Sequence, residues 1–305
     1  MIPRIAFLGF LVFSFHGKCQ SRFFENADTL NKKRAITVAS SISTVWAGSM
    51  IGLSQVWYDN VEKTSFHTFD DSKNWMQMDK AGHVYTANKI SMLTGDLFLW
   101  SGMQNKHAAW CGFGVGLGYQ MTLEMLDAYS SEWGFSWSDV GANVLGSSSY
   151  LGQQLAWKEQ RILFKFSTHP TEYAQYRPEV LGGNFAERLL KDYNGQTYWL
   201  SASPGSFAKN SGFPKWLCFS IGYSVDQKLV GDQDFYTDLG DSPPQSIRSF
   251  EAKRQVLMSL DIDFSQFDIK RPWLRTIVKQ FNYLKLPFPT LILTDGKAGG
   301  SLLYF

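Results

Sequence analysis

"MDKAGHVYTANK", residues 78–89, places an acid and an imidazole one helical turn apart at the start of a segment that then becomes apolar. Asp79 and His83 are four residues apart, so they share one face of a helix, with Lys80 beside the acid. Apolar residues continue this pattern to about residue 102. The stretch therefore predicts a helix over about 79–102 with Asp79, Lys80 and His83 at its start.

Two later stretches add polar pairs at helical spacing. "TLEMLDAY" contains Glu124 and Asp127 at i, i+3, and "FSWSDVGANVLG" contains Ser136, Asp139 and Asn143. Acids within or beside apolar helices are costly unless they are paired, so their first interpretation is functional. The helices that carry them are predicted over about 107–128 and 136–157. Short connections between these helices would bring the polar pairs to a single point.

Glycines repeat every second residue in "CGFGVGLGYQ", residues 111–120, and give two overlapping GxxxG spacings. In a water-exposed helix each glycine costs roughly 1 kcal/mol relative to alanine. Close contact between helices explains this density. A phosphate-binding loop is disfavoured, because no strand precedes the stretch and no Lys-Ser/Thr pair follows it.

The stretch before the opening motif is also helical in character. "AITVASSISTVWAGSMIGLSQVWY", residues 35–58, has no charge and is long enough to span a bilayer. Gly48 and Gly52 form a small-xxx-small spacing that would let a second helix approach. A buried helix of a soluble bundle is the alternative. The basic residues 32–34 precede this helix, which conflicts with a simple inner-membrane orientation if the N-terminal signal is removed.

The first twenty residues resemble an export signal. Arg4 precedes an apolar run over residues 5–15, and small residues such as Gly17 and Cys19 follow. We predict a signal peptide over 1–20, with its retention as a further membrane span left open. His16 and Lys18 do not match a lipidation signal, so we predict no lipid on Cys19.

Composition limits the class of protein. A chain of 305 residues with 44% hydrophobic content can bury a sizeable core. The formal net charge of +2 argues against nucleic-acid binding. Aromatic residues make up 16% of the chain, an excess found at membrane–water boundaries. A soluble core rich in aromatic residues is the alternative. Membrane lipid is the expected partner, and a protein partner is left open.

The character of the chain changes near residue 160. "WLCFSIGYSV" and "VLMSLDIDF" alternate as amphipathic strands, the second with Ser259, Asp261 and Asp263 opposite its apolar side chains. Residues 272–285 predict an amphipathic helix that lies either in a membrane interface or over the sheet. About four or five strands can be counted, too few for a membrane barrel.

Together these patterns predict a mainly α fold. We expect a membrane-associated bundle of about four helices over 30–160, followed by a smaller α+β region over 161–305 with a few antiparallel strands. We expect an exported protein associated with a membrane of the cell envelope at its periplasmic face, with inner or outer membrane undecided.

The sequence resembles the YfiM-like family of predicted periplasmic lipoproteins, a domain of unknown function. The resemblance covers about residues 30–230 and is strongest in "MDKAGH", "EMLDAYSSEWGFSWSDVGANVLG" and "KDYNGQTYWLS". More distantly it resembles VanZ-type membrane proteins, which combine an Asp-Lys-x-x-His helix start, an acid pair and a Ser-x-x-Asp-x-x-x-Asn-x-x-Gly helix. VanZ-like proteins often carry an arginine before that serine, where this chain has Gly134 and Phe135. The family name implies lipidation, and neither family implies a reaction.

Two classes of function stay open. In the first, the protein is not an enzyme, and a buried polar network joins the helices; Asp79 and Asp139 would also cap helix starts. In the second, His83, Glu124, Asp127 and Asp139 are catalytic acids and bases or ligands of a divalent metal, acting on a lipid-linked or cell-wall substrate. Around them the structural network would comprise Asp79, Lys80, Ser136 and Asn143. No other cofactor is expected, and a transporter or scaffold is a further alternative.

Overall fold

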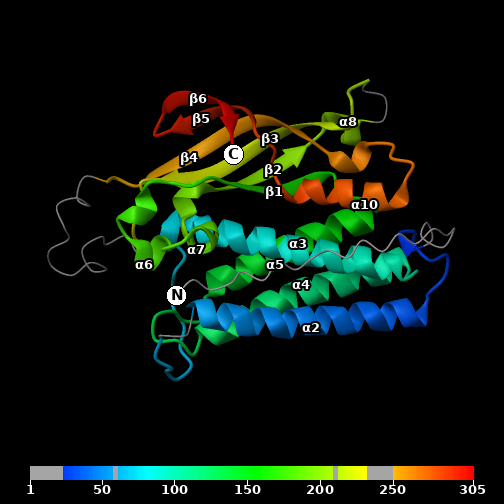
Figure 1. Cartoon of the computed structure of the whole chain (residues 1–305), viewed down its shortest axis with the longest axis horizontal. Helices are drawn as coiled ribbons and strands as arrows, with labels where there is room; N and C mark the ends of the chain where they lie inside the picture. The colour runs from blue at the N-terminus through cyan, green and yellow to red at the C-terminus, as the bar shows by residue number, and fades with distance from the viewer. Residues whose placement is uncertain (1–22, 58–60, 209–211, 232–249) are drawn as a thin grey trace, which may run out of the picture.

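The structure is a computed structural model that describes residues 23–57, 61–208, 212–231 and 250–305. The predicted signal peptide therefore lies outside the described residues. Four long helices lie roughly parallel or antiparallel, and a twisted antiparallel sheet covers one side of them (Figure 1). The helices are α2 (Lys32–Trp57), α3 (Met78–Trp100), α4 (Asn105–Asp127) and α5 (Trp137–Trp157). The predicted fold class, a helical bundle followed by antiparallel strands, is confirmed.

Small residues let α3, α4 and α5 approach closely. A Cβ atom at Gly116 of α4 would overlap Ser91 Oγ of α3, and one at Gly112 would overlap the Ser91 carbonyl oxygen. By contrast, a Cβ atom at Gly114 would meet nothing within 4 Å. Close helix contact therefore explains two of the glycines of this helix, as the GxxxG spacing predicted.

Helix α2 lies on the outside of this three-helix core (Figure 1). Its Trp46 faces Gly118 and Tyr119 of α4, while Ile36 and Val45 are 66% and 68% exposed. A Cβ atom at Gly48 or Gly52 would have no neighbour within 4 Å, so these glycines do not mediate the predicted helix contact within the described part of the chain. Residues Lys32–Gln55 are long and apolar enough to cross a membrane.

Six strands form the sheet, in the order in which they occur along the chain, and every neighbouring pair is antiparallel. They are β1 (Ile162–Thr168), β2 (Gln196–Ala202), β3 (Leu217–Asp226), β4 (Lys253–Ile262), β5 (Phe288–Thr294) and β6 (Lys297–Tyr304). The expected four or five strands were too few. The last hairpin turns at Asp295 and Gly296, whose φ angles of 47° and 76° suit a type I′ turn.

The sheet curls so that its last strand reaches its second. Tyr304 OH lies 3.0 Å from Thr197 Oγ1, and the Tyr304 ring packs against Trp199. The enclosed face is polar at its centre. There Lys165 Nζ is 2.9 Å from Asp261 Oδ2, and both side chains are completely buried. Trp199 and Leu257 are buried on the same enclosed face, whereas Phe219, Ile221 and Met258 are exposed on the outer face.

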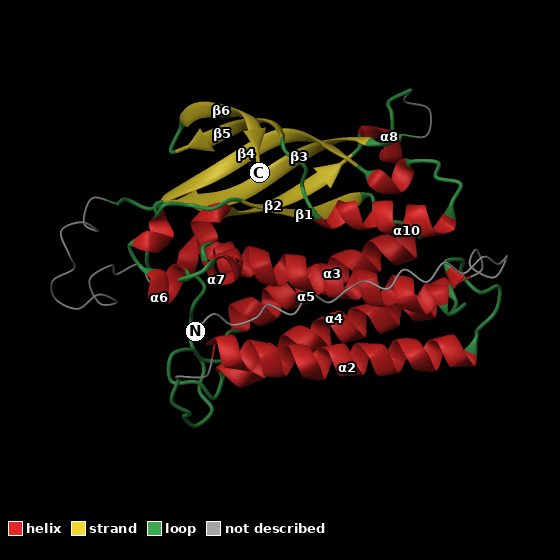
Figure 2. Ribbon diagram, viewed as in Figure 1, coloured by secondary structure: helices red, strands yellow, loops and turns green. Residues whose placement is uncertain are grey.

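Short helices connect and flank these elements (Figure 2). Before α3 stands η1 (Asn74–Gln77). Between strands β1 and β3 lie η2 (Tyr173–Gln175), α6 (Pro178–Leu181), α7 (Phe185–Lys191), η3 (Tyr193–Gly195) and α8 (Pro204–Phe207). Between β4 and β5 lie η4 (Phe264–Gln266), α10 (Pro272–Gln280) and η5 (Phe281–Tyr283). The predicted helix over 272–285 is thus present as α10, with a 3-10 turn after it.

Candidate functional site

A cluster of charges surrounds the ammonium group of Lys80, at the end of the bundle where α3 and α5 begin and α4 ends. Lys80 Nζ lies 2.6 Å from Asp71 Oδ2, 3.0 Å from Asp79 Oδ2 and 2.8 Å from Asp139 Oδ1. These carboxylates come from the loop before α3, from α3 itself and from α5. One cation therefore joins three separate segments of the chain.

His83 lies one turn further into the bundle and faces the same acids. Its Nε2 is 3.8 Å from Asp79 Oδ1 and 3.9 Å from Asp139 Oδ1, and its Nδ1 is 3.6 Å from Glu124 Oε1. Nδ1 also lies 3.0 Å from Asn143 Oδ1, which accepts from Gln120 Nε2 at 3.1 Å. Three carboxylates within 4 Å favour the protonated, cationic imidazole.

We call this set the Lys80 network. Its members are Asp71, Asp79, Lys80, His83, Gln120, Glu124, Asp139 and Asn143.

An unusual backbone turn sets the start of α3. Trp75, Met76 and Gln77 all have positive φ angles, of 50°, 51° and 66°, which non-glycine residues rarely adopt. The turn is held from the C-terminal region: the Trp75 N–H donates to the Gly231 carbonyl at 2.9 Å, and Arg254 Nη2 donates to Gln77 Oε1 at 2.6 Å. The sheet region thereby fixes where α3 begins and where its first-turn acid points.

Helix α5 begins with a serine cap. Ser136 Oγ accepts from the Asp139 backbone N–H at 3.1 Å, as expected of an N-cap serine. The expectation that Asp139 itself caps this helix is therefore wrong, because its carboxylate faces Lys80 instead. Gln77 occupies the N-cap position of α3 and makes no side-chain cap, so Asp79 is a first-turn acid and does not cap the helix.

Asp71 anchors the loop before α3 to the start of α5. Its Oδ1 accepts from Ser138 Oγ at 2.7 Å and from Ser136 Oγ at 2.5 Å, and its Oδ2 faces Lys80. Burial alone would raise the pKa of Asp71, but the hydrogen bonds from Asp139, Lys80 and the two serines outweigh it and lower the pKa to about 2. Asp71 is therefore a carboxylate at any physiological pH.

Seven of the eight residues singled out from the sequence come together here. They are Asp79, Lys80, His83, Glu124, Ser136, Asp139 and Asn143.

Asp127 differs from these seven. It is the last residue of α4 and follows Glu124 by three positions, on the same side of the helix, but it makes none of the ion pairs described above. In the part of the chain that the structure describes, the ligand atoms of Asp79, His83 and Asp139 lie within 4.8 Å of one another and could hold a metal ion. Of the predicted metal ligands His83, Glu124, Asp127 and Asp139, this group contains His83 and Asp139, together with Asp79.

Sequence reasoning missed four contributors. Gln120 is one turn before Glu124 on the same buried helix face, a spacing that could have identified it. Tyr193 OH donates to Asp79 Oδ1 at 2.9 Å and lies in the quoted stretch "KDYNGQTYWLS". Asp71 and Ser138 carry no periodic signal, because their positions depend on how an irregular loop crosses the helix ends.

The arrangement has two chemical uses. Lys80 and His83 supply two positive charges for the four carboxyl groups of the Lys80 network, so the buried unit is neutral without a bound ion when two of these carboxyl groups carry a proton. The hydrogen bond between Asp71 and Asp139 is one place for such a proton. Alternatively, an imidazole between carboxylates can transfer protons or bind a metal. In the second case a metal ion would have to compete with the Lys80 ammonium for Asp79 and Asp139.

The fold and this site define a class: a helical bundle with internal ion pairs, carrying a curled sheet and an apolar N-terminal helix. Residues 67–153 match the model of a family described as predicted periplasmic lipoprotein (DUF2279). The matched range contains the whole Lys80 network and ends before the sheet. No curated protein and no solved structure matches the chain. The family match fits an exported, envelope-associated protein of uncharacterised function.

Proposed function

We propose that this is a membrane-associated protein of the cell envelope in which the Lys80 network is structural and not catalytic. In this proposal the network fixes the loop before α3, the start of α3 and the start of α5 in one register. Tyr193 extends the connection to the region that precedes β2. The bundle and the sheet would then act as one rigid unit at the membrane.

The observation that supports this proposal is the position of Lys80. Its ammonium lies within 3.0 Å of three carboxylates, in the place where a bound cation would be expected. The protein thus supplies its own counter-ion. A lysine so placed competes with a divalent metal and neutralises the acids that a catalytic site would need.

A second candidate function rests on the ligand-distance group of Asp79, His83 and Asp139. One imidazole and two carboxylates form a plausible ligand set for Zn, Mn or Fe. Such a site would act on a lipid-linked or cell-wall substrate, because an envelope protein meets these substrates. This candidate requires Lys80 to move away from the carboxylates.

Two measurements on the purified full-length protein in detergent separate these candidates. Elemental analysis of the native protein should find no stoichiometric transition metal, and added Zn²⁺ or Mn²⁺ should leave the melting temperature unchanged. His83→Ala and Glu124→Gln should each lower the free energy of unfolding by roughly 1 to 3 kcal/mol, since each leaves a buried polar partner unsatisfied. One bound ion per chain, lost in His83→Ala while the fold persists, would contradict the structural proposal and support the second candidate.

A further inference from the structure

The outward face of α5 is that of a helix in lipid. Asp139 is the one charged residue in this helix, and it is buried together with the polar residues Asn143, Gln153 and Gln154. By contrast, Leu145 on the outside is 59% exposed. A soluble bundle has the opposite distribution, with polar side chains outside and apolar ones inside.

Tryptophans mark both ends of the same helix. Trp137 begins α5 and is 72% exposed, and Trp157 ends it. With a rise of 1.5 Å per residue, the two are about 30 Å apart along the helix axis, which equals the thickness of the hydrocarbon core of a bilayer. Tryptophan is enriched at the two membrane–water interfaces, so this spacing suits a membrane-spanning helix.

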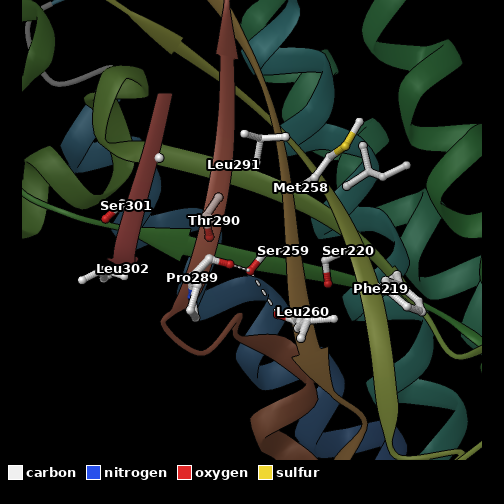
Figure 3. Close-up of a pocket in the computed structure, with 12 residues that line it drawn as sticks. Phe219, Ser220, Met258, Ser259, Leu260, Pro289, Thr290, Leu291, Ser301 and Leu302 are labelled. Atoms are coloured by element: carbon white, nitrogen blue, oxygen red, sulfur yellow. Dashed lines mark hydrogen bonds between the residues drawn. The ribbon is translucent and has the colours of Figure 1, made fainter. Parts of the chain in front are cut away.

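The sheet repeats the inverted pattern. Its outer face exposes Phe219, Ile221 and Met258 at 54%, 59% and 45%, while Ser220 and Ser259 of the same strands are buried on the inner face. Figure 3 shows part of this outer face around a groove of about 630 Å³, with Leu260, Leu291 and Leu302 also in its lining. An alternating strand with apolar residues outside and polar residues inside is typical of sheets that face lipid.

Charge gathers at the end of the bundle opposite to the Lys80 network. Arg34 Nη1 donates to the Trp100 carbonyl at 3.1 Å, and Asn105 pairs with Gln154, so α2 and α4 begin where α3 and α5 end. The basic residues at this end come from several segments. They are Lys32, Lys33, Arg34, Lys106, Lys158 and Arg161, against the three acids Glu25, Asp28 and Glu159 of the same segments, of which Glu159 pairs with Arg161. Such an end matches the anionic head groups of a bilayer.

We infer that lipid acyl chains cover a continuous belt formed by α2, the outward face of α5 and the outer face of β3 to β5. The bundle then spans the bilayer with its helix axes along the membrane normal, and the basic end lies at one head-group layer. This inference deepens the proposed membrane association and does not depend on the role of the Lys80 network.

A bilayer explains these surfaces better than a protein partner does. Helix α2 and the sheet lie on opposite sides of the molecule (Figure 1), and α5 contributes a further apolar face. The exposed side chains of β3 to β5 continue the sheet face whose Phe166 and Tyr198 pack against Tyr85 of α3. One partner would have to surround the chain to cover all three, whereas lipid does so without specific contacts. Among the helices that the structure describes, only α2 reaches the hydropathy of a membrane span, because buried polar residues such as Lys89, Gln120 and Asn143 lower the mean hydropathy of α3, α4 and α5.

Spin labels on single cysteines test this inference. The full-length protein, with its native cysteines replaced by alanine, would carry a label at Ile51→Cys on α2, Leu145→Cys on α5 or Ile221→Cys on β3. Each variant is reconstituted in vesicles of phosphatidylethanolamine and phosphatidylglycerol. Collisions with oxygen report lipid, and collisions with a nickel chelate report water. Glu132→Cys, in the exposed loop before α5, is the aqueous control.

We expect Leu145→Cys and Ile221→Cys to show more collisions with oxygen than with nickel, and Glu132→Cys to show the reverse. Nickel access at either Leu145→Cys or Ile221→Cys would overturn the inference. If Ile51→Cys still reports lipid in that case, the proposed membrane association survives through α2 alone. If all three positions report water, both proposals fail.

Discussion

The bundle and the sheet both keep their ions inside, but they do so in different ways. In the sheet, Lys165 and Asp261 form one completely buried pair, supported by Ser201 Oγ at 2.8 Å from Asp261 Oδ2. In the bundle, Lys80 serves three carboxylates and its side chain is 13% exposed. The sheet pair fastens β1 to β4 across the curled interior. The Lys80 network joins segments that have no backbone hydrogen-bond ladder between them. Its loss should therefore change how these segments are aligned more than how tightly they pack.

The largest effect is expected from the sheet. Lys165→Met leaves Asp261 as a buried charge without its cation and should lower the free energy of unfolding by about 3 to 5 kcal/mol. Denaturant titration in detergent, followed by tryptophan fluorescence, measures the change. Arg161→Met breaks an exposed pair with Glu159 and should cost less than about 1 kcal/mol. Equal losses of stability in the two variants would show that the contribution of an ion pair in this protein does not depend on its burial.

The same pair also tests whether the sheet requires charge at all. Lys165→Met combined with Asp261→Leu replaces two ions by apolar side chains of similar size. Such replacements are often neutral or stabilising, so the double variant should recover most of the loss seen in Lys165→Met. A double variant as unstable as the single one would indicate that the polar interior of the sheet has a role beyond charge balance.

An intermediate effect is expected in the bundle. Lys80→Met leaves three carboxylates facing one another, and we expect a loss of about 2 to 3 kcal/mol, smaller than in the sheet because water reaches the site. Lys106→Met, at the exposed start of α4, is the matched control. Hydrogen exchange would show whether the loop 61–73 loosens together with the start of α5, as expected for a cluster that fixes register. If the sheet loosens instead, the Lys80 network does not fix the register of the bundle segments.

Two glycines of α4 test how closely α3 and α4 pack. Gly116→Ala would force a methyl group against Ser91 and should cost about 1 to 3 kcal/mol. Gly114→Ala meets open space and should be neutral or stabilise by up to about 1 kcal/mol, through its better helix propensity. Thermal unfolding of the two variants measures the difference. Similar melting temperatures would show that α3 and α4 are not in close contact at Gly116.

The smallest effect on stability is expected when the pH is lowered. The pKa of Asp71 is lowered from 3.8 to about 2, so its ion pairs add stability that is fully present above about pH 4 and is lost as the pH falls toward 2. The expected loss is about 1 to 2 kcal/mol. Asp71→Asn should be less stable at neutral pH and should lack this part of the acid dependence. An unchanged acid profile in Asp71→Asn would show that other carboxylates dominate it.

Much of the fold was accessible from the sequence, because its helices obey local rules. The uncharged run over 35–58, the acid-led start near residue 79 and the serine before α5 mark helix boundaries within a few residues of those observed. The two strands with strict alternation were also found. The missed strand β1 follows α5 after only four residues, and β5 and β6 were obscured by a proline and four small residues.

The site was less accessible for a physical reason. Helical spacing predicts which side chains share a face, and that rule brought His83, Glu124 and Asp139 together. It cannot predict an irregular loop, so Asp71 was missed, although it makes the shortest ion pair with Lys80.

The carboxylates that pair with Lys80 come from different segments of the chain, and this affects how the chain can enter a bilayer. Helix α3 carries Asp79 and Lys80 in its first turn and Lys89 and Asp96 further along. A charge at the centre of a lone helix costs about 2.5 to 3.5 kcal/mol to insert, and less near the helix end. The groups that neutralise Lys80 from outside this helix lie in the loop before it and in α5. If the bundle spans the bilayer as inferred above, α3 should enter lipid together with α4 and α5 after the three helices have associated, whereas α2 is apolar enough to insert first and alone.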